Sequence, residues 1–194
     1  MIEKKKRMSA KICLFGDSAV GKTCLIRRYV KNEFDDKYIT TIGTNISKKK
    51  ITVNHPMKND TEVEVSLMIW DIMGQKGFRH LLQEAYFDGA SGAIGVCDVT
   101  RRETFTGLEE WMTSLIKVAG DIPIVLLGNK SDLTGKASVT LDEIKELSLR
   151  NIENGWREDL KDFINHGREP NLLSSAKTGE NVEIAFARLA EMVI

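Results

Sequence analysis

The eight residues from Gly16 to Thr23 constrain the fold of this chain more than any other stretch, because they match the pattern G-x-x-x-x-G-K-[ST]. Gly16 and Gly21 permit a tight turn in which successive amide N–H groups point inward toward phosphate oxygens. Lys22 supplies a positive charge, and Thr23 offers a hydroxyl to Mg²⁺ at the start of a helix whose dipole favours anions. The stretch therefore predicts a loop that binds a polyphosphate.

The sequence on either side of this loop supports that interpretation. Residues 11–15 form a short apolar run typical of a buried strand, and Leu25, Ile26, Tyr29 and Val30 recur at helical spacing. Strand, glycine-rich loop and helix is the order that the motif requires. An ordinary glycine turn with an incidental lysine is the alternative, and this context disfavours it.

Composition limits the classes of protein to which the chain can belong. Its 194 residues suit one domain, and 28 basic against 28 acidic residues give no reason to expect nucleic-acid binding. No apolar run approaches the length of a membrane span, and the start of the chain lacks a secretory signal. Cys13, Cys24 and Cys97 have no metal-ligand spacing, so we expect free, buried thiols in a cytoplasmic protein.

The two ends of the chain carry further expectations. A basic run, Lys4–Arg7, precedes the first strand, so we expect residues 1–8 to be a flexible terminus; a weak contact with anionic lipid is the alternative. The chain ends at Ile194 without a terminal cysteine, so no lipidation motif is visible and any membrane association would be peripheral. Residues 9–194 are expected to form a single domain.

Apolar stretches alternate with amphipathic ones along the remainder of the chain. Residues 45–53 and 61–71 are typical of strands joined by a turn, which predicts an antiparallel hairpin. Apolar strands at 92–97 and 122–128 flank a helical face at 105–116. This alternation indicates an α/β fold with a mostly parallel sheet covered by helices on both faces. Right-handed crossovers place the loops that follow the strands at one edge.

Polar residues follow the strand at 61–71 at that edge. Asp71 is able to hold Mg²⁺ through its water shell, because it ends a buried strand on the same side as the phosphate loop. Gly74 offers an N–H to a terminal phosphate, and Gln75 is able to orient a water. By itself, the pattern D-x-x-G is weak evidence for a phosphate and metal site, since an ordinary turn also contains Asp and Gly.

A second polar group, Asn129-Lys130-Ser131-Asp132, follows the strand at 122–128. The Asp132 carboxylate is able to accept hydrogen bonds from the adjacent N–H and NH₂ donors that guanine has and adenine lacks. A backbone N–H in Ser174-Ser175-Ala176-Lys177 would meet the guanine carbonyl. Either tetrapeptide alone is more typical of a polar loop.

Together these elements resemble the Ras superfamily of small GTPases, most closely its Rab branch. The resemblance implies the Ras-like P-loop NTPase fold, with a six-stranded sheet that contains one antiparallel strand. Five ordered elements along nearly the whole chain are far more specific than one motif. They are Gly16–Thr23, Thr41-Ile42-Gly43, Trp70-Asp71 with Gly74-Gln75, Asn129-Lys130-x-Asp132 and Ser175-Ala176-Lys177.

The resemblance implies a role for each matching residue. Lys22 would bind the β- and γ-phosphates. Thr23 and Thr41 would ligate Mg²⁺ in the triphosphate state, with Asp71 behind a coordinated water.

The implied catalytic set adds Gly74 and Gln75 to Lys22 and Thr41. Gly74 N–H would sense the γ-phosphate, and Gln75 would position the attacking water. The residues expected around GTP or GDP are Asp17, Ser18, Ala19, Val20, Gly21, Lys22, Thr23, Cys24, Phe34, Tyr38, Thr41, Gly74, Asn129, Lys130, Asp132, Ser175, Ala176 and Lys177.

The implied activity is that of a GTP/GDP switch in vesicle trafficking or signalling, with GTP hydrolysis that is slow without an activating protein. Residues 34–46 and 71–87 would contact effector, exchange and GTPase-activating proteins, and the chain would be a monomer. The alternative is a guanine-nucleotide-bound scaffold with little hydrolysis, which Ile72 and Met73 suggest because they depart from the usual second switch.

Two further departures separate this chain from the family pattern. Lys76 replaces an acidic residue that helps exchange factors act. An insertion at about 150–170 lengthens the chain before Ser175, and its apolar residues Trp156, Leu160, Phe163 and Ile164 fall at helical spacing. We expect a helix packed on the domain, with a partner-binding helix as the alternative.

Overall fold

The computed structural model describes residues 6–35, 41, 43–56, 58, 61–72, 84–153, 163–164 and 167–194, with the backbone alone described for 151–153. In this part of the chain, six strands form one sheet in the order β2-β3-β1-β4-β5-β6. Neighbouring strands are parallel except for β2 and β3, which confirms the predicted α/β sheet and its hairpin. The strands are β1 (Lys6–Phe15), β2 (Thr44–Asn54), β3 (Glu62–Ile72), β4 (Gly92–Asp98), β5 (Ile124–Asn129) and β6 (Leu172–Ser174).

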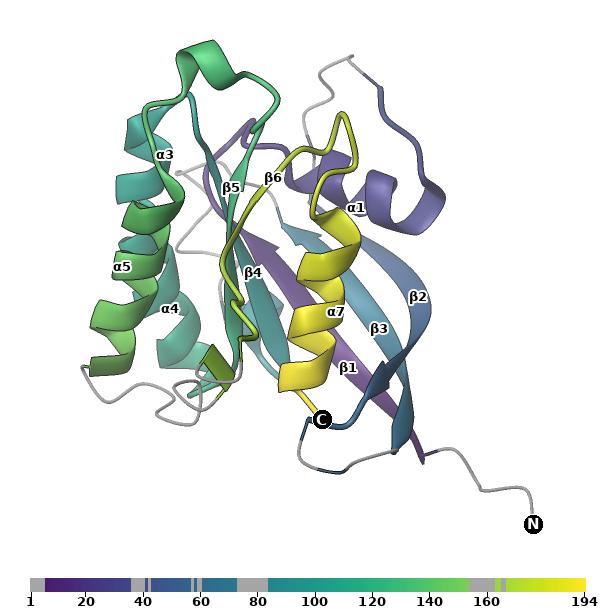
Figure 1. Cartoon of the computed structure of the whole chain (residues 1–194). Helices are drawn as coiled ribbons and strands as arrows, with labels where there is room; N and C mark the ends of the chain where they lie inside the picture. Colours follow the sequence, from purple (N-terminus) through teal and green to yellow (C-terminus); the bar gives the residue numbers. More distant parts are fainter. Residues whose placement is uncertain are drawn as a thin grey trace.

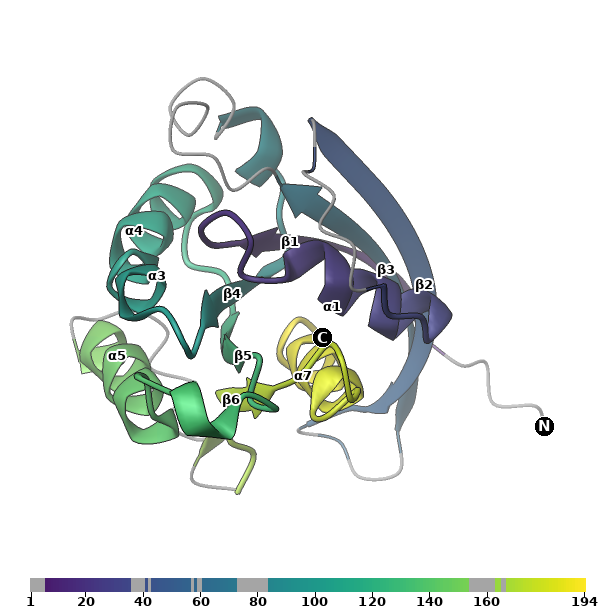
Figure 2. The same ribbon diagram turned by 90° about the horizontal axis from the view of Figure 1, so that it is seen from above.

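Helices cover both faces of the sheet, as Figures 1 and 2 show. One face carries α1 (Lys22–Lys31) and α7 (Val182–Met192), and the other carries α3 (Arg102–Thr106), α4 (Leu108–Ala119) and α5 (Leu141–Glu153). A short 3₁₀ helix, η2 (Thr134–Lys136), precedes α5. The loops after the strands meet at one edge because the parallel strands all point the same way.

The central strand β1 shows why the chain folds into three layers. Ile12 and Leu14 belong to the core under α1 and α7, whereas Cys13 and Phe15 belong to the core under α4 and α5. Successive side chains of a strand point to opposite faces, so an apolar run with no alternation supplies both cores.

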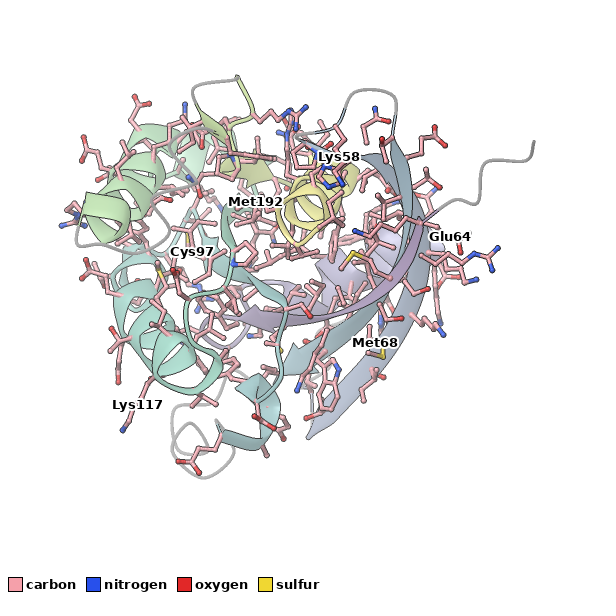
Figure 3. The ribbon with its side chains drawn as sticks, turned by 90° about the horizontal axis from the view of Figure 1, so that it is seen from below. Lys58, Glu64, Met68, Cys97, Lys117 and Met192 are labelled. Carbon is pink, nitrogen blue, oxygen red and sulfur yellow. The ribbon has the colours of Figure 1, made fainter. Side chains whose placement is uncertain are left out.

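The helical face predicted at 105–116 is divided between α3 and α4, which meet at Gly107. Trp111, Met112 and Leu115 are buried on the sheet side of α4, as expected for core residues. Lys117 is exposed and points away from the sheet in Figure 3. The amphipathic pattern therefore gave the correct buried face.

The start of the chain corrects the expectation of a flexible terminus through residue 8. β1 begins at Lys6, which pairs with Val63, and the parallel pairing with β3 continues from there. Arg7 Nε also lies 3.4 Å from a carboxylate oxygen of Glu64. The prediction failed for residues 6–8 because backbone hydrogen bonds to the long strand β3 order charged residues too. Residues 1–5 lie outside the described residues.

The predicted insertion at about 150–170 is described only in part. The helix α5 extends to Glu153, while Trp156 and Leu160 lie outside the described residues. Phe163 and Ile164 are half-buried, and Ile164 packs against the core under α4 and α5. That contact agrees with packing on the domain, but a helix through this segment stays a prediction.

Candidate functional site

The loop between β1 and α1 has a backbone that only glycine permits at two positions. Gly16 and Gly21 have φ angles of +130° and +102°. A Cβ at Gly16 would lie 2.1 Å from the carbonyl oxygen of Val96, and a Cβ at Gly21 would lie 2.3 Å from Asn129 Nδ2. The loop therefore packs directly on β4 and β5, which leaves no room for side chains there.

Lys22 begins α1 with its side chain folded back over the loop. Its Nζ donates hydrogen bonds to the carbonyl oxygens of Gly16 at 2.8 Å and Asp17 at 2.9 Å. Burial lowers the pKa of Lys22 to about 8, although Asp71 and Asp17 act in the opposite direction. A buried ammonium group in this loop is an electrostatic partner for a phosphate.

Three side chains from other elements anchor the loop, each through a hydrogen bond to a different loop residue. Trp111 Nε1 donates to Asp17 Oδ1 at 3.0 Å, Arg101 Nη2 to the Ser18 carbonyl at 2.9 Å, and Asn129 Nδ2 to the Val20 carbonyl at 2.8 Å. The anchors come from α4, the start of α3 and the end of β5. The loop conformation is thus set by the tertiary structure as well as by its glycines.

Thr23, Thr41 and Asp71 lie together beside Lys22. Thr23 Oγ1 donates to Asp71 Oδ2 at 2.5 Å and lies 2.9 Å from Thr41 Oγ1. Asp71 Oδ1 is buried without a hydrogen-bond partner among the described residues. Burial raises the pKa of Asp71, and the Thr23 hydrogen bond and the Lys22 charge only partly offset this effect. Two hydroxyls and an unpaired carboxylate oxygen fit a hard cation such as Mg²⁺.

The loops after β5 and β6 lie side by side at the same edge. Ser175 Oγ donates to Asp132 Oδ1 at 2.6 Å, and the Ala176 N–H donates to Asn129 Oδ1 at 3.2 Å. Asp132 is only half-exposed. These contacts bring the two segments predicted to recognise guanine together, as expected if both contact one base.

Sequence reasoning missed four side chains that hold this site in place. Arg28 on α1 donates to the carbonyl oxygens of Ala176 and Lys177 at 2.9 and 2.7 Å, and nothing in the pattern of α1 indicates this contact. The other three are Asp98, Arg101 and Trp111. Asp98 had a usable signal, because it ends the fully buried strand β4. Trp111 was expected in the core, where its ring lies, but its N–H also contacts the phosphate loop.

The remaining predicted site residues fall into three groups. Cys24 and Phe34 are half-buried and pack against the core under α1 and α7. Tyr38, Gly74 and Gln75 lie outside the described residues, so their predicted roles stay predictions. Lys130 follows Asn129 at the site, but its Nζ is paired with Asp98 at 2.6 Å.

Two kinds of feature are absent from the described residues. In the ranges given above, no helix is long and apolar enough to cross a membrane. Nor do three or more His, Cys, Asp or Glu side chains gather as a metal site among the described residues. The group formed by Thr23, Thr41 and Asp71 is of a different kind, because only one of its three members is among those residue types.

Comparison with known proteins gives consistent matches along almost the whole chain. Residues 11–194 match the Ras family. Ras-related protein SEC4 of Saccharomyces cerevisiae is 36% identical over 188 residues, which cover 94% of this chain and 74% of SEC4. GTP-binding protein ypt4 of Schizosaccharomyces pombe is 33% identical, with coverage of 95% and 71%. Ras-related protein Rab-2B of Dictyostelium discoideum is 34% identical, with coverage of 95% and 80%.

The family match includes the loop between β1 and α1 and the loops after β5 and β6, whose geometry is described above. The similarity extends through every element of the fold rather than through the phosphate loop alone. The chain therefore belongs to the Ras superfamily of small GTPases, in its Rab branch, and is a GTP-binding, GTP-hydrolysing switch protein.

Proposed function

We propose that the edge of the sheet formed by the phosphate loop, Asp71 and Asp132 binds one guanine nucleotide with Mg²⁺ and hydrolyses bound GTP to GDP and phosphate. One observation carries this proposal: an unpaired carboxylate oxygen of Asp71 lies with two hydroxyls beside a buried lysine in a glycine-rich loop. Such a group has no evident structural purpose without a cation and an anion to bind.

The phosphate end of the site follows from these contacts. In our proposal, the amides of residues 17–24 surround the phosphates, and Lys22 exchanges its carbonyl partners for the β- and γ-phosphate oxygens. Thr23 and Thr41 would hold Mg²⁺ through their hydroxyls, and Asp71 would hold it through its unpaired oxygen or a water. When bound, Mg²⁺ neutralises negative charge on the phosphate oxygens.

The base end of the site discriminates guanine from adenine. Asp132 accepts from the ring N–H and the exocyclic NH₂ of the base, while the backbone N–H near Ala176 meets its carbonyl oxygen. We also assign Phe34 and Lys130 to the base pocket, because both match the residues that the family resemblance places there. Asn129 orients both loops through its bonds to Val20 and Ala176, and we assign the second N–H of its amide group to the base.

The switch residues complete the mechanism. We assign to Gln75 the positioning of the attacking water and to Gly74 the contact with the γ-phosphate; both assignments depend on the family resemblance. Thr41 precedes β2, so loss of the γ-phosphate releases a segment that partner proteins contact. Membership of the Ras family favours this hydrolysing switch over a scaffold that does not hydrolyse GTP.

The cellular role that we propose is vesicle trafficking by a monomer that associates peripherally with membranes. Its support is the Rab branch to which SEC4 and Rab-2B belong. Effector, exchange and activating proteins would bind residues 34–46 and 71–87.

Two measurements test the proposal. Mass spectrometry of nucleotide released from the purified protein should identify GDP or GTP in about equal molar amount to protein. Single-turnover phosphate release in Mg²⁺ should exceed the no-protein control and fall to it in Gln75→Leu. Equal uptake of adenine nucleotides would contradict the assigned base site. Phosphate release at the level of the control, even with candidate activating proteins, would instead support the scaffold.

A further inference from the structure

A buried carboxylate at the end of β4 lies between the phosphate loop and the base-recognition segment. The side chain of Asp98 is 2% exposed. Its Oδ1 accepts hydrogen bonds from the Thr100 N–H at 2.9 Å and the Thr100 hydroxyl at 2.7 Å. Its Oδ2 accepts from Lys130 Nζ at 2.6 Å and Arg101 Nε at 3.0 Å. The carboxylate is therefore fully satisfied, and it fixes two cations at once.

Arg101 connects this carboxylate to the phosphate loop. While its Nε bonds to Asp98, its Nη2 donates to the carbonyl oxygen of Ser18 at 2.9 Å. A guanidinium group is planar and presents its donors in a fixed geometry, so the two bonds fix the distance between Asp98 and Ser18. Ser18 lies in the middle of the loop whose amides we assign to the phosphates.

Lys130 connects the same carboxylate to the base-recognition segment. Its backbone has a φ of +69°, which is uncommon for a residue with a Cβ and costs free energy. The short ion pair with Asp98 is one interaction that offsets this cost. Asp132, which we assign to the guanine base, follows two residues later. The position of Asp98 therefore affects both the phosphate loop and the base-recognition segment.

We propose that Arg101 is a positioning residue for nucleotide binding: held by Asp98, it fixes the Ser18 carbonyl and with it the phosphate-binding conformation of the loop. Asp98 positions both ends of the site, because Lys130 depends on the same carboxylate. The inference rests on the proposed nucleotide site and adds residues that contact neither phosphate nor base.

The neighbouring residue Arg102 is a matched control. Like Arg101, it makes one bond to a carboxylate and one to a carbonyl: Nη2 bonds to Glu143 Oε1 at 2.5 Å and Nη1 to the Ser138 carbonyl at 2.7 Å. These bonds join α3 to α5 and to the segment before it, away from the phosphate loop. Each substitution removes a guanidinium group that bonds to one carboxylate and one carbonyl, so Arg102→Met controls for the loss of such a group next to Arg101.

The experiment compares Arg101→Met, Arg102→Met and Asp98→Asn in the full chain. Dissociation of fluorescent GDP in Mg²⁺ is measured by stopped flow, and the affinity for GMP by competition. We expect Arg101→Met to release GDP about tenfold faster, the effect of one lost charge-assisted hydrogen bond. Its affinity for GMP should stay within about twofold, because GMP lacks the β-phosphate that the loop surrounds. Arg102→Met should match the parent protein.

Asp98→Asn should weaken both ligands, because it loosens Arg101 and Lys130 together. Equal release rates for the two arginine variants would overturn the inference. So would an equal loss of GDP and GMP affinity in Arg101→Met, since that result indicates a general structural role. If the parent protein itself binds no GDP, the proposed nucleotide site is wrong. If the parent binds GDP but the two arginine variants behave alike, only the positioning role of Arg101 is wrong.

Discussion

The side-chain amide of Asn129 donates from Nδ2 to the carbonyl oxygen of Val20 at 2.8 Å and so joins the end of β5 to the phosphate loop. Its Oδ1 accepts from the N–H of Ala176 at 3.2 Å. One buried side chain, 1% exposed, therefore links three loops that are far apart in the sequence. Such a position should affect ligand binding more than overall stability.

We expect Asn129→Ala to release GDP about 10- to 100-fold faster. The substitution leaves a buried carbonyl and a buried N–H without partners, at a cost of about 1–3 kcal/mol each. Asn171→Ala is the control, because Asn171 is equally buried and its Oδ1 accepts from the Leu126 N–H at 3.1 Å on a part of β5 before the site. It should lower the melting temperature without changing GDP release. Similar release rates in the two variants would show that Asn129 has no special role.

Gly21→Ala should abolish nucleotide binding. A Cβ there would lie 2.3 Å from Asn129 Nδ2, on a backbone with a φ of +102° that disfavours any side chain. Fluorescent GDP titration measures the effect. Gly135→Ala in η2 is the control, since a Cβ at Gly135 would meet nothing within 4 Å. Retention of GDP by Gly21→Ala at parental affinity would mean that the loop conformation described here is wrong.

Asp132→Asn should exchange the base preference of the site from guanine toward xanthine. Xanthine has a carbonyl in place of the exocyclic amine of guanine, so an amide donor at residue 132 would suit it better than a carboxylate. We expect the affinity for GDP to fall by on the order of a hundredfold and the affinity for xanthosine diphosphate to rise. Asp142→Asn, on the exposed first turn of α5, should change neither affinity. If Asp132→Asn left the ratio of the GDP affinity to the xanthosine diphosphate affinity unchanged, Asp132 would not be part of the base site.

Cys13 and Cys97 should resist thiol reagents in the folded protein. Both side chains are fully buried, and burial raises the pKa of each thiol to about 12. At pH 8 only about one thiol in 10⁴ would then be ionised, and the thiolate is the reactive form. We expect native protein to be labelled at no residue except Cys24, which is half-buried, and denatured protein at all three. Labelling of native Cys24→Ala would contradict this expectation.

The same two thiols give a pH dependence whose sign follows from linkage. A pKa raised by folding means that the unfolded chain loses its thiol protons first, from about pH 9. Below that pH, each thiol contributes its full share to the free energy of unfolding. This share falls by about 1.4 kcal/mol per pH unit as the pH rises toward 12. Cys97→Ala should therefore show a smaller decline of the unfolding free energy than the parent between pH 9 and 10.5. Parallel curves would exclude this contribution.

Met73→Ala should raise the single-turnover rate of GTP hydrolysis. The family resemblance places Met73 beside the metal and the γ-phosphate, where its bulk would crowd the second switch. Met68→Ala is the control, because Met68 lies on β3 with 39% of its surface exposed and is labelled on the sheet in Figure 3. It should leave the intrinsic rate unchanged. An unchanged rate in Met73→Ala would dispose of the idea of crowding.

Much of the fold and of the site was predictable, because local patterns encode them. The glycines at 16 and 21 mark a backbone that no other residue adopts at low cost, and the apolar strands at 92–97 and 122–128 indicate parallel strands buried on both faces. From these features followed the edge at which Thr23, Asp71, Asn129 and Asp132 meet. The start of β1 was misjudged because the pairing of Lys6 depends on the length of β3, not on the residues around it.

By itself, the sequence indicated the residues to which we assign the chemistry of this protein, since the phosphate-loop pattern, the threonine assigned to Mg²⁺ and the aspartate assigned to the base each depend on particular side chains at fixed spacing. Only the tertiary structure decided what holds them in place. Arg101 bonds to a carbonyl 83 residues away, and Trp111 bonds to a carboxylate 94 residues away. The crossovers bring such partners together from distant parts of the chain, and these bonds require no fixed spacing between donor and acceptor, so they leave no pattern in the sequence.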